Sequence, residues 1–255
     1  MLPNALHVGS AKAASTWLYQ ACLEHPEVYA PPHNDNLNFF VVHYHEGLDW
    51  YQQRYFAEWR GEKAAIDFSN SYLISELALQ RIARDLPEAQ LSCILRNPVE
   101  RAYLHWAHTY YKSDRRYGGE PETDSGNPLD AAPERPEGRL FQLPLEVVQH
   151  PNGWVWCRMM LEPGLYGFHL RQMRHCFPAE RIHVMLYDDL CVDPQGVLAR
   201  YFEFLGVDAA FRPGCLHRDI NPDAPGTDPA SLPGELRTFL AAFYREDIAE
   251  LEALI

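Results

Sequence analysis

Short apolar runs alternate with amphipathic segments along this chain, and this pattern limits the folds that it can adopt. The apolar runs have the length of buried strands and end in polar or small residues; they are ALHV (5–8), KAAID (63–67), LSCIL (91–95) and RIHVMLY (181–187). Helical periodicity is found in residues 15–24, 74–85, 98–111, 165–176, 194–205 and 233–254. This alternation predicts a three-layer α/β fold, in which helices flank both faces of a central parallel β-sheet.

The length of the chain favours one domain. A chain of 255 residues is near the upper size of a single hydrophobic core, so we expect a single domain over 1–255. Two polar stretches rich in proline interrupt the pattern, at about 112–150 and about 212–235. Loops of this length in a compact domain are either functional or disordered. We expect the first stretch to be a mobile lid over the substrate; for both stretches a functional role and disorder stay open as alternatives.

Charge and cysteine usage exclude several classes of function. A net charge of −13 argues against binding to nucleic acid, which needs a surplus of Lys and Arg. No apolar stretch is long enough to span a membrane, and the N-terminus lacks a signal-peptide pattern, so we expect a cytoplasmic protein. The six cysteines are scattered, and the pair His43 and His45 supplies too few ligands for a metal site.

The first stretch that carries chemistry is GSAKAAST, residues 9–16, between a predicted strand and a predicted helix. Backbone N–H groups at a helix N-terminus bind anions, and a turn of small residues lets them approach a phosphate or sulfate. Lys12 adds a positive charge, while Ser15 and Thr16 add hydroxyl donors. The nucleotide motif G-x-x-x-x-G-K-[ST] is not matched. An ordinary turn with a capping serine is the alternative.

The second stretch is LSCILRNPVERAYLHWAHTYY, residues 91–111. Arg96 follows the predicted strand, and Pro98 begins the predicted helix. If this strand neighbours the first one, Arg96 points into the same crevice, where its planar guanidinium suits a phosphate. A surface ion pair is the alternative for Arg96. His105 and His108 lie on the helix, where a half-buried aromatic face is the alternative to a functional role.

Together the two stretches resemble the sulfotransferases that use 3′-phosphoadenosine 5′-phosphosulfate (PAPS), especially bacterial and heparan-sulfate-type members. KAASTWL is similar to the family loop K-x-G-T/S-T-x-L, and RNPVERAYL to R-N-P-x-x-R-A-Y-S. The likeness continues through IDFSNSYL and the late blocks, and misses only about 112–150. It implies a P-loop-like fold, with the 212–235 loop on the nucleotide side. It also implies that PAPS is held by Lys12, Ala13, Ala14, Ser15, Thr16, Trp17, Arg96 and Arg101.

Three positions depart from the family pattern. Ala14 stands where the family loop has a glycine, and a glycine would be needed there if the backbone had a positive φ. Leu104 replaces the serine that assists Arg96, so one hydrogen bond to the 3′-phosphate should be missing. Asn36 stands where relatives carry a glutamate that takes the proton from the acceptor, and a neutral amide cannot act as a base. We therefore consider His108 first and Asp35 second as the base; His33 is a further imidazole that could do so.

The resemblance implies sulfuryl transfer from PAPS to a hydroxyl or amine of a small-molecule acceptor, with no metal required. Lys12 would neutralise the charge that builds on the bridging oxygen. The expected acceptor-side residues are His33, Asn36, Phe40, Ser69, Tyr72, His105 and His108. The alternatives are a carbohydrate sulfotransferase, a nucleotide-binding protein without turnover, and a magnesium-dependent phosphotransferase. We expect no nucleic-acid or membrane partner.

Overall fold

The computed structural model describes residues 1–32, 36–116, 160–217 and 229–255. Contacts between Cα atoms divide the chain into two compact units, and each is described by itself. The sheet unit consists of Met1–Asn97, Tyr166–Pro222 and Asp247–Ile255, and the α4 unit of Pro98–Leu165 and Asp223–Glu246. The single domain over 1–255 stays a prediction.

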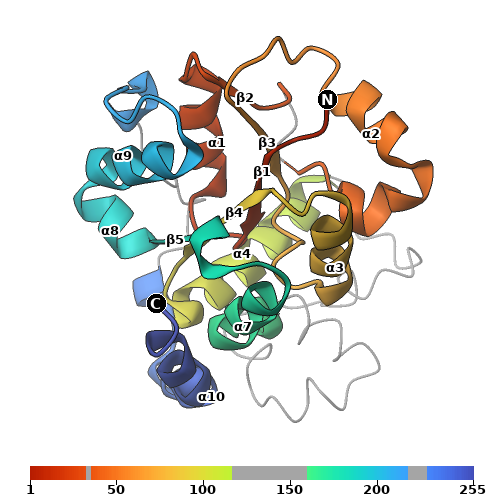
Figure 1. Cartoon of the computed structure of the whole chain (residues 1–255). Helices are drawn as coiled ribbons and strands as arrows, with labels where there is room; N and C mark the ends of the chain where they lie inside the picture. The colour runs from red at the N-terminus through yellow and green to blue at the C-terminus, as the bar shows by residue number, and fades with distance from the viewer. Residues whose placement is uncertain (33–35, 117–159, 218–228) are drawn as a thin grey trace. The chain divides into compact units, whose positions relative to one another are not determined.

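A five-stranded sheet forms the centre of the sheet unit (Figure 1). The strand order is β2-β3-β1-β4-β5, and every neighbouring pair is parallel. The predicted α/β architecture with a central parallel sheet is therefore confirmed, and so are its four predicted strands. The sequence missed β2, which has only two residues. The strands are β1 (Ala5–Gly9), β2 (Val28–Tyr29), β3 (Ala64–Phe68), β4 (Gln90–Leu95) and β5 (Ile182–Leu186).

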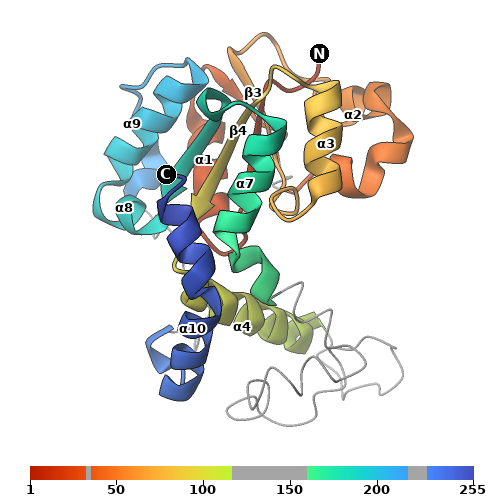
Figure 2. The same cartoon turned by 60° about the horizontal axis from the view of Figure 1, so that its bottom comes forward.

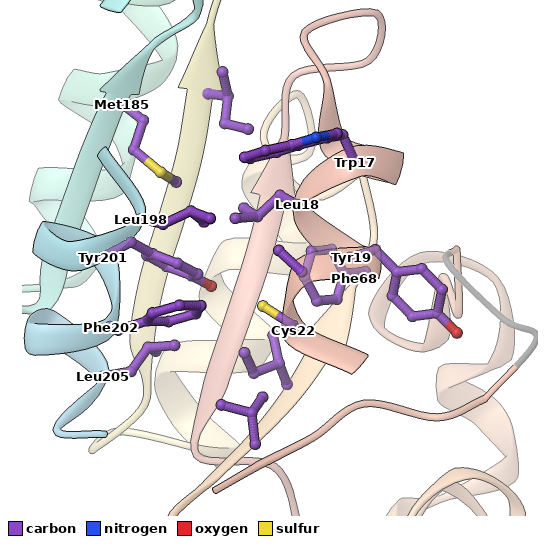
Figure 3. Close-up of a cluster of buried hydrophobic side chains, with 14 of the residues drawn as sticks. Trp17, Leu18, Tyr19, Cys22, Phe68, Met185, Leu198, Tyr201, Phe202 and Leu205 are labelled. Carbon is purple, nitrogen blue, oxygen red and sulfur yellow. The ribbon is translucent and has the colours of Figure 1, made fainter. Parts of the chain in front are cut away.

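Three helices cover one face of this sheet: α1 (Ser15–Glu24), α8 (Tyr187–Val192) and α9 (Pro194–Leu205). Figure 3 shows side chains of α1 and α9 meeting over the strands in one buried cluster, which includes Leu18 and Phe202. As predicted, a proline opens α9, and the Asp193 side chain accepts a hydrogen bond from the Gly196 N–H at 2.9 Å.

The opposite face is covered by α2 (Leu48–Tyr55), α3 (Glu76–Asp85) and α7 (Tyr166–Cys176), as Figure 2 shows. The Asp247 carboxylate caps α7, because its two oxygens accept the N–H groups of Gly167 and Phe168 at 2.9 and 2.8 Å. The sequence predicted α3 and α7 but not α2. Short turns also occur in this unit: η1 (Phe39–His43, a π-helix), η2 (Tyr44–Glu46), η5 (Ala179–Arg181) and η6 (Gly214–His217).

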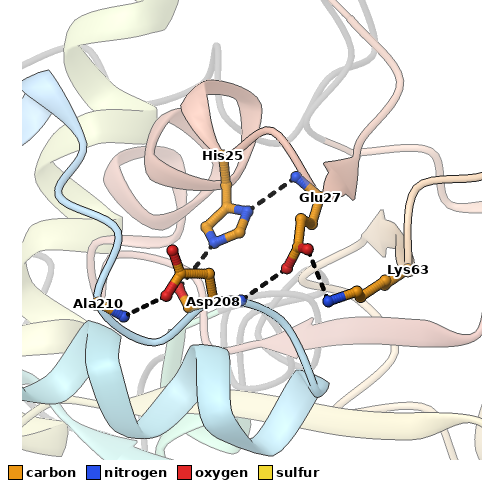
Figure 4. Close-up of polar contacts among 5 residues, drawn as sticks. All are labelled: His25, Glu27, Lys63, Asp208 and Ala210. Carbon is orange, nitrogen blue, oxygen red and sulfur yellow. Dashed lines mark hydrogen bonds and ion pairs between the residues drawn. The ribbon is translucent and has the colours of Figure 1, made fainter.

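A polar cluster ties the segment after α1 to the segment after α9 (Figure 4). His25 is 2% exposed, accepts the Glu27 N–H at its Nδ1, and lies 3.0 Å from the Asp208 carbonyl oxygen through its Nε2. Glu27 in turn accepts the Asp208 N–H at 2.8 Å and pairs with Lys63 at 2.7 Å. Since Glu27 and Lys63 directly precede β2 and β3, this cluster lies at the amino ends of the strands.

The α4 unit contains α4 (Pro98–Arg116), η4 (Glu162–Gly164), η7 (Pro229–Ser231) and the first part of α10 (Gly234–Glu252). The Tyr244 hydroxyl on α10 donates to the Leu161 carbonyl oxygen at 2.9 Å. The predicted lid at about 112–150 begins inside α4, and its remainder from 117 lies outside the described residues. Of the predicted loop at about 212–235, residues 218–228 also lie outside them, and η6 and η7 are short helical turns on either side.

Candidate functional site

The loop between β1 and α1 leaves the sheet at a glycine that the geometry requires. Gly9 has a φ of +147°, and a Cβ there would lie 3.1 Å from the Cβ of Leu73. The next residue, Ser10, donates its N–H to the Ile94 carbonyl oxygen at 3.0 Å. The start of this anion loop (residues 10–16) is therefore fixed to the carboxyl end of β4.

The anion loop has left-handed backbone at two positions that are not glycine. Lys12 has a φ of +68° and Ala14 a φ of +70°. Ala14 is buried and is the N-cap residue of α1, so its methyl group forms no side-chain hydrogen bond to the first turn. The replacement of the family glycine by Ala14 thus falls at a position of positive φ, where alanine is strained by roughly 1 to 2 kcal/mol.

The donors predicted for an anion lie in the anion loop and in the first turn of α1. Lys12 and Ser15 are half-buried, and Thr16 is exposed. Ala13 and Ala14 are buried, so any contact they make with an anion would come from the backbone. The donor set of an ammonium group, two hydroxyls and a helix N-terminus fits a phosphosulfate, because all of these groups favour negative charge.

Trp17 is placed differently from its neighbours in the motif. Its indole is 5% exposed and packs in the cluster of Figure 3, and its Nε1–H donates to the Cys215 carbonyl oxygen at 3.1 Å. The indole N–H therefore connects α1 to η6. A direct contact of Trp17 with PAPS stays a prediction.

Arg96 follows β4, and β4 pairs with β1. The two predicted strands are therefore neighbours, as a shared crevice for Arg96 and the anion loop requires. The Arg96 side chain is 7% exposed, and its guanidinium carbon lies 4.1 Å from the centre of the Tyr187 ring. This stacking contributes attraction between the cation and the ring, and it orients the planar guanidinium. Arg96 and the anion loop thus project from the carboxyl ends of neighbouring strands, where ligands bind in α/β folds.

Asn36, which we predicted to stand in place of the family glutamate, is exposed and is held by a residue that the sequence analysis did not single out. Its Oδ1 accepts from the main-chain N and from the Nδ2 of Asn70, at 3.3 and 3.2 Å. The Asn70 Nδ2 also lies 3.2 Å from the Ser15 Oγ. Asn70 therefore connects the anion loop to the segment that carries Asn36.

A buried carboxylate is linked to the segment 36–40 through Ser69 and Tyr72. Asp67 on β3 is fully buried and accepts three hydroxyl hydrogen bonds, from Tyr51 at 2.5 Å, Ser69 at 2.6 Å and Tyr72 at 2.8 Å. Burial raises the pKa of Asp67 from 3.8 to about 6, and the three hydroxyl donors oppose part of that rise. Burial, together with the nearby Asp67 carboxylate, also raises the pKa of the Tyr51 and Tyr72 hydroxyls.

Three predicted acceptor-side residues belong to this buried network. Ser69 and Tyr72 are fully buried; the Ser69 Oγ accepts the Asn38 N–H at 2.9 Å, and the Tyr72 hydroxyl accepts the Phe40 N–H at 3.2 Å. The Phe40 ring is also fully buried. In this structure these side chains hold the segment 36–40 in place, and their contact with an acceptor stays a prediction.

Arg101 and His105 lie on α4, in the other unit. Arg101 is fully buried, donates to the Met160 carbonyl oxygen, and has its Nη1 3.3 Å from the His105 Nδ1. Leu104, which replaces the family serine, is 5% exposed. Within its own unit Arg101 ties α4 to the segment before η4, and its role toward a 3′-phosphate stays a prediction.

The candidate bases cannot be placed. His33 and Asp35 lie outside the described residues, and His108 lies on α4 in a part whose side chains are not described. Among the described residues no group of three or more His, Cys, Asp or Glu side chains could hold a metal ion. No described helix is both long and apolar enough to cross a membrane.

The chain matches the model of the sulfotransferase domain family over residues 3–219. It belongs to the sulfotransferase family. Of the solved structures, a sulfotransferase from Alicyclobacillus acidocaldarius is 26% identical with a TM-score of 0.70, and the match covers 100% of this sulfotransferase chain and 96% of that one. The sulfotransferase domain from the curacin biosynthetic pathway, at 14% identity and a TM-score of 0.54, shares the fold.

Curated relatives of this sulfotransferase domain include larger enzymes. The bifunctional heparan sulfate N-deacetylase/N-sulfotransferase 3 of Homo sapiens is 26% identical over 286 residues, and number 2 of Mus musculus is 27% identical over 285. Both alignments cover 100% of this chain but only 30% and 29% of the relatives. The chain thus spans about a third of the length of these relatives.

Sequence reasoning did not name Asp67, Asn70, Tyr51 or Tyr187 as site residues. A signal was present for two of them, because Asp67 and Asn70 both lie in IDFSNSYL, which the family resemblance included. Tyr187 and Tyr51 carried none, since each reaches its partner only when strands or helices distant in sequence pack together.

Proposed function

We propose that this sulfotransferase transfers the sulfuryl group of PAPS to a hydroxyl or amine of a small-molecule acceptor and releases 3′-phosphoadenosine 5′-phosphate (PAP). The observation that carries the proposal is the pair of cationic groups at one edge of the sheet. Lys12 lies in the loop after β1, and Arg96 follows the adjacent β4. Two cationic groups that follow neighbouring strands suit a nucleotide with a charged group at each end.

The chemistry of the proposal is an in-line displacement at sulfur. The acceptor oxygen or nitrogen forms a bond to sulfur while the bond from sulfur to the bridging oxygen breaks, and that oxygen leaves on PAP with the electron pair. Lys12 neutralises the charge on the leaving oxygen, with Ser15, Thr16 and the N-terminus of α1 as further donors. The acceptor proton passes to a base, for which His108 is the first candidate and Asp35 the second.

A small acceptor is favoured by the net charge of −13, because a long polyanionic glycan would be repelled by this surface charge. The relatives named for heparan sulfate N-sulfotransfer favour a second candidate, a carbohydrate amine as acceptor. The two candidates are separated by comparing turnover with PAPS on two kinds of acceptor. One is a panel of small phenols, alcohols and amines, and the other is N-deacetylated heparan sulfate.

Calorimetric titration tests the donor. Wild-type protein should bind PAP more tightly than ATP, and Lys12→Ala and Arg96→Ala should each weaken PAP binding by about 10-fold to 100-fold, the worth of a charged hydrogen bond. Lys63→Ala is the matched control, because Lys63 lies at the amino end of β3, away from the proposed site, and should leave PAP affinity unchanged. Equal affinity of the wild type for PAP and ATP would overturn the proposal.

A further inference from the structure

The Asn70 side chain lies between the two parts of the site that would act on the sulfuryl group. Its Nδ2 is 3.2 Å from the Ser15 Oγ in the anion loop and 3.2 Å from the Asn36 Oδ1. Because one nitrogen contacts both groups, Ser15 and Asn36 are neighbours across Asn70. Asn70 itself directly follows Ser69, whose hydroxyl is held by Asp67.

The hydrogen-bond pattern fixes which way the Asn36 amide points. The main-chain N of Asn70, which can only donate, lies 3.3 Å from the Asn36 Oδ1, so that atom must be the oxygen. The same oxygen accepts from the Asn70 Nδ2. The Nδ2 of Asn36 is therefore directed away from Asn70 with two N–H donors, on a side chain that is exposed.

The same contacts fix the Asn70 amide and the Ser15 hydroxyl. The Asn70 Oδ1 is buried and has no hydrogen-bond partner in the described part of the chain, whereas its Nδ2 has two. A flipped amide would place two oxygens against each other at Asn36, so the orientation is determined. Since the Ser15 Oγ accepts from Asn70, the Ser15 hydrogen is left to donate to another group.

The segment that carries Asn36 is hydrogen-bonded to β3 and to the turn that follows it. The Leu37 N–H donates to the Phe68 carbonyl oxygen at 3.2 Å, and the Asn38 N–H donates to the Ser69 Oγ at 2.9 Å. The backbone on either side of the contact is thus attached to β3 and the turn after it. Asn36 cannot turn over without breaking the contacts with Asn70.

We propose that Asn70 is a positioning residue that turns Ser15 and Asn36 into a pair of hydrogen-bond donors for the sulfuryl group of PAPS. Asn36 then has a role opposite to that of the glutamate in its relatives, because it donates to the anion instead of taking a proton. This inference rests on the proposed function. Its consequence is a preference for PAPS over PAP, which lacks the sulfuryl group.

The test is the ratio of PAPS affinity to PAP affinity, measured by calorimetry without an acceptor. Asn36→Asp is the decisive variant, because its carboxylate still accepts both hydrogen bonds from Asn70 but loses the N–H donors and adds a negative charge. It should weaken PAPS binding tenfold or more and PAP binding less than threefold. Asn70→Ala should act in the same direction. A loss of overall folding would weaken both ligands equally and is seen in the PAP titration.

Ser71→Ala is the matched control. The Ser71 hydroxyl donates to the Asn38 Oδ1 at 2.6 Å, so it supports the same segment without touching Ser15 or Asn36. Its PAPS-to-PAP ratio should equal that of the wild type. An unchanged ratio in both Asn36→Asp and Asn70→Ala overturns the inference and leaves the proposed function intact. A wild type that does not prefer PAP over ATP overturns the proposed function itself.

Discussion

Replacement of Asp67 by asparagine should change how the stability of this protein depends on pH. The Asp67 carboxylate is fully buried among three hydroxyl donors, and burial raises its pKa from 3.8 to about 6. Asparagine has nearly the same shape and does not titrate. The Asp67→Asn variant therefore removes one titration while it keeps the volume of the side chain.

The direction in which the unfolding free energy changes with pH depends on whether the folded or the unfolded state binds the Asp67 proton more tightly. The folded pKa of Asp67 is above the unfolded one, so between about pH 3.8 and 6 the folded state holds more protons. The stabilisation is complete below the unfolded pKa and is lost as the pH rises through the folded pKa. Over the full window it amounts to about 3 kcal/mol, and between pH 4.5 and 7.5 to about 2 kcal/mol.

Urea unfolding monitored by tryptophan fluorescence measures this effect. The unfolding free energy of the wild type minus that of Asp67→Asn should fall by about 2 kcal/mol from pH 4.5 to 7.5. Tyr51→Phe removes a hydrogen bond that lowers the pKa of Asp67, so it should move the transition to higher pH. Ser71→Ala, whose hydroxyl bonds to Asn38, should reproduce the wild-type pH dependence. Parallel stability curves for wild type and Asp67→Asn would show that Asp67 does not titrate with a raised pKa.

Four further substitutions test the turn that begins at Gly9 and the polar cluster of Figure 4 by chemical unfolding. Gly9→Ala should cost about 1 to 3 kcal/mol, because φ is +147° and the new Cβ would lie 3.1 Å from that of Leu73; unchanged stability would contradict the loop geometry. Ala14→Val should cost a similar amount, since a β-branched side chain is poorly accommodated at a φ of +70°, whereas Ala14→Gly should not lower stability, because glycine adopts this φ without strain. His25→Ala should cost about 2 to 4 kcal/mol, because His25 is 2% exposed and the centre of its ring lies 4.6 Å from that of Phe202; a loss below 1 kcal/mol would show that the side chains around the polar cluster repack.

The agreement between sequence and structure is closest where the pattern is local and regular. The helix predicted at residues 194–205 is observed with the same bounds, because Asp193 and Pro194 mark its start and the apolar spacing marks its buried face. The helix Leu48–Tyr55 was missed, since it is short and only Tyr51 of it is fully buried. Its importance comes from one hydroxyl that reaches Asp67, which no local pattern indicates.

From the sequence alone we could predict the parallel α/β fold, the loop with Lys12 between the first strand and the first helix, and the arginine that follows the third predicted strand. These follow from periodicity, from residue types at strand ends, and from the likeness of two motifs to one family. Three features are visible only in the folded chain: β1 and β4 are neighbours, Ala14 has a positive φ, and Asn70 joins Ser15 to Asn36. The physical reason is that backbone angles and hydrogen-bond partners depend on groups far apart in the chain, which approach one another only when the sheet is assembled.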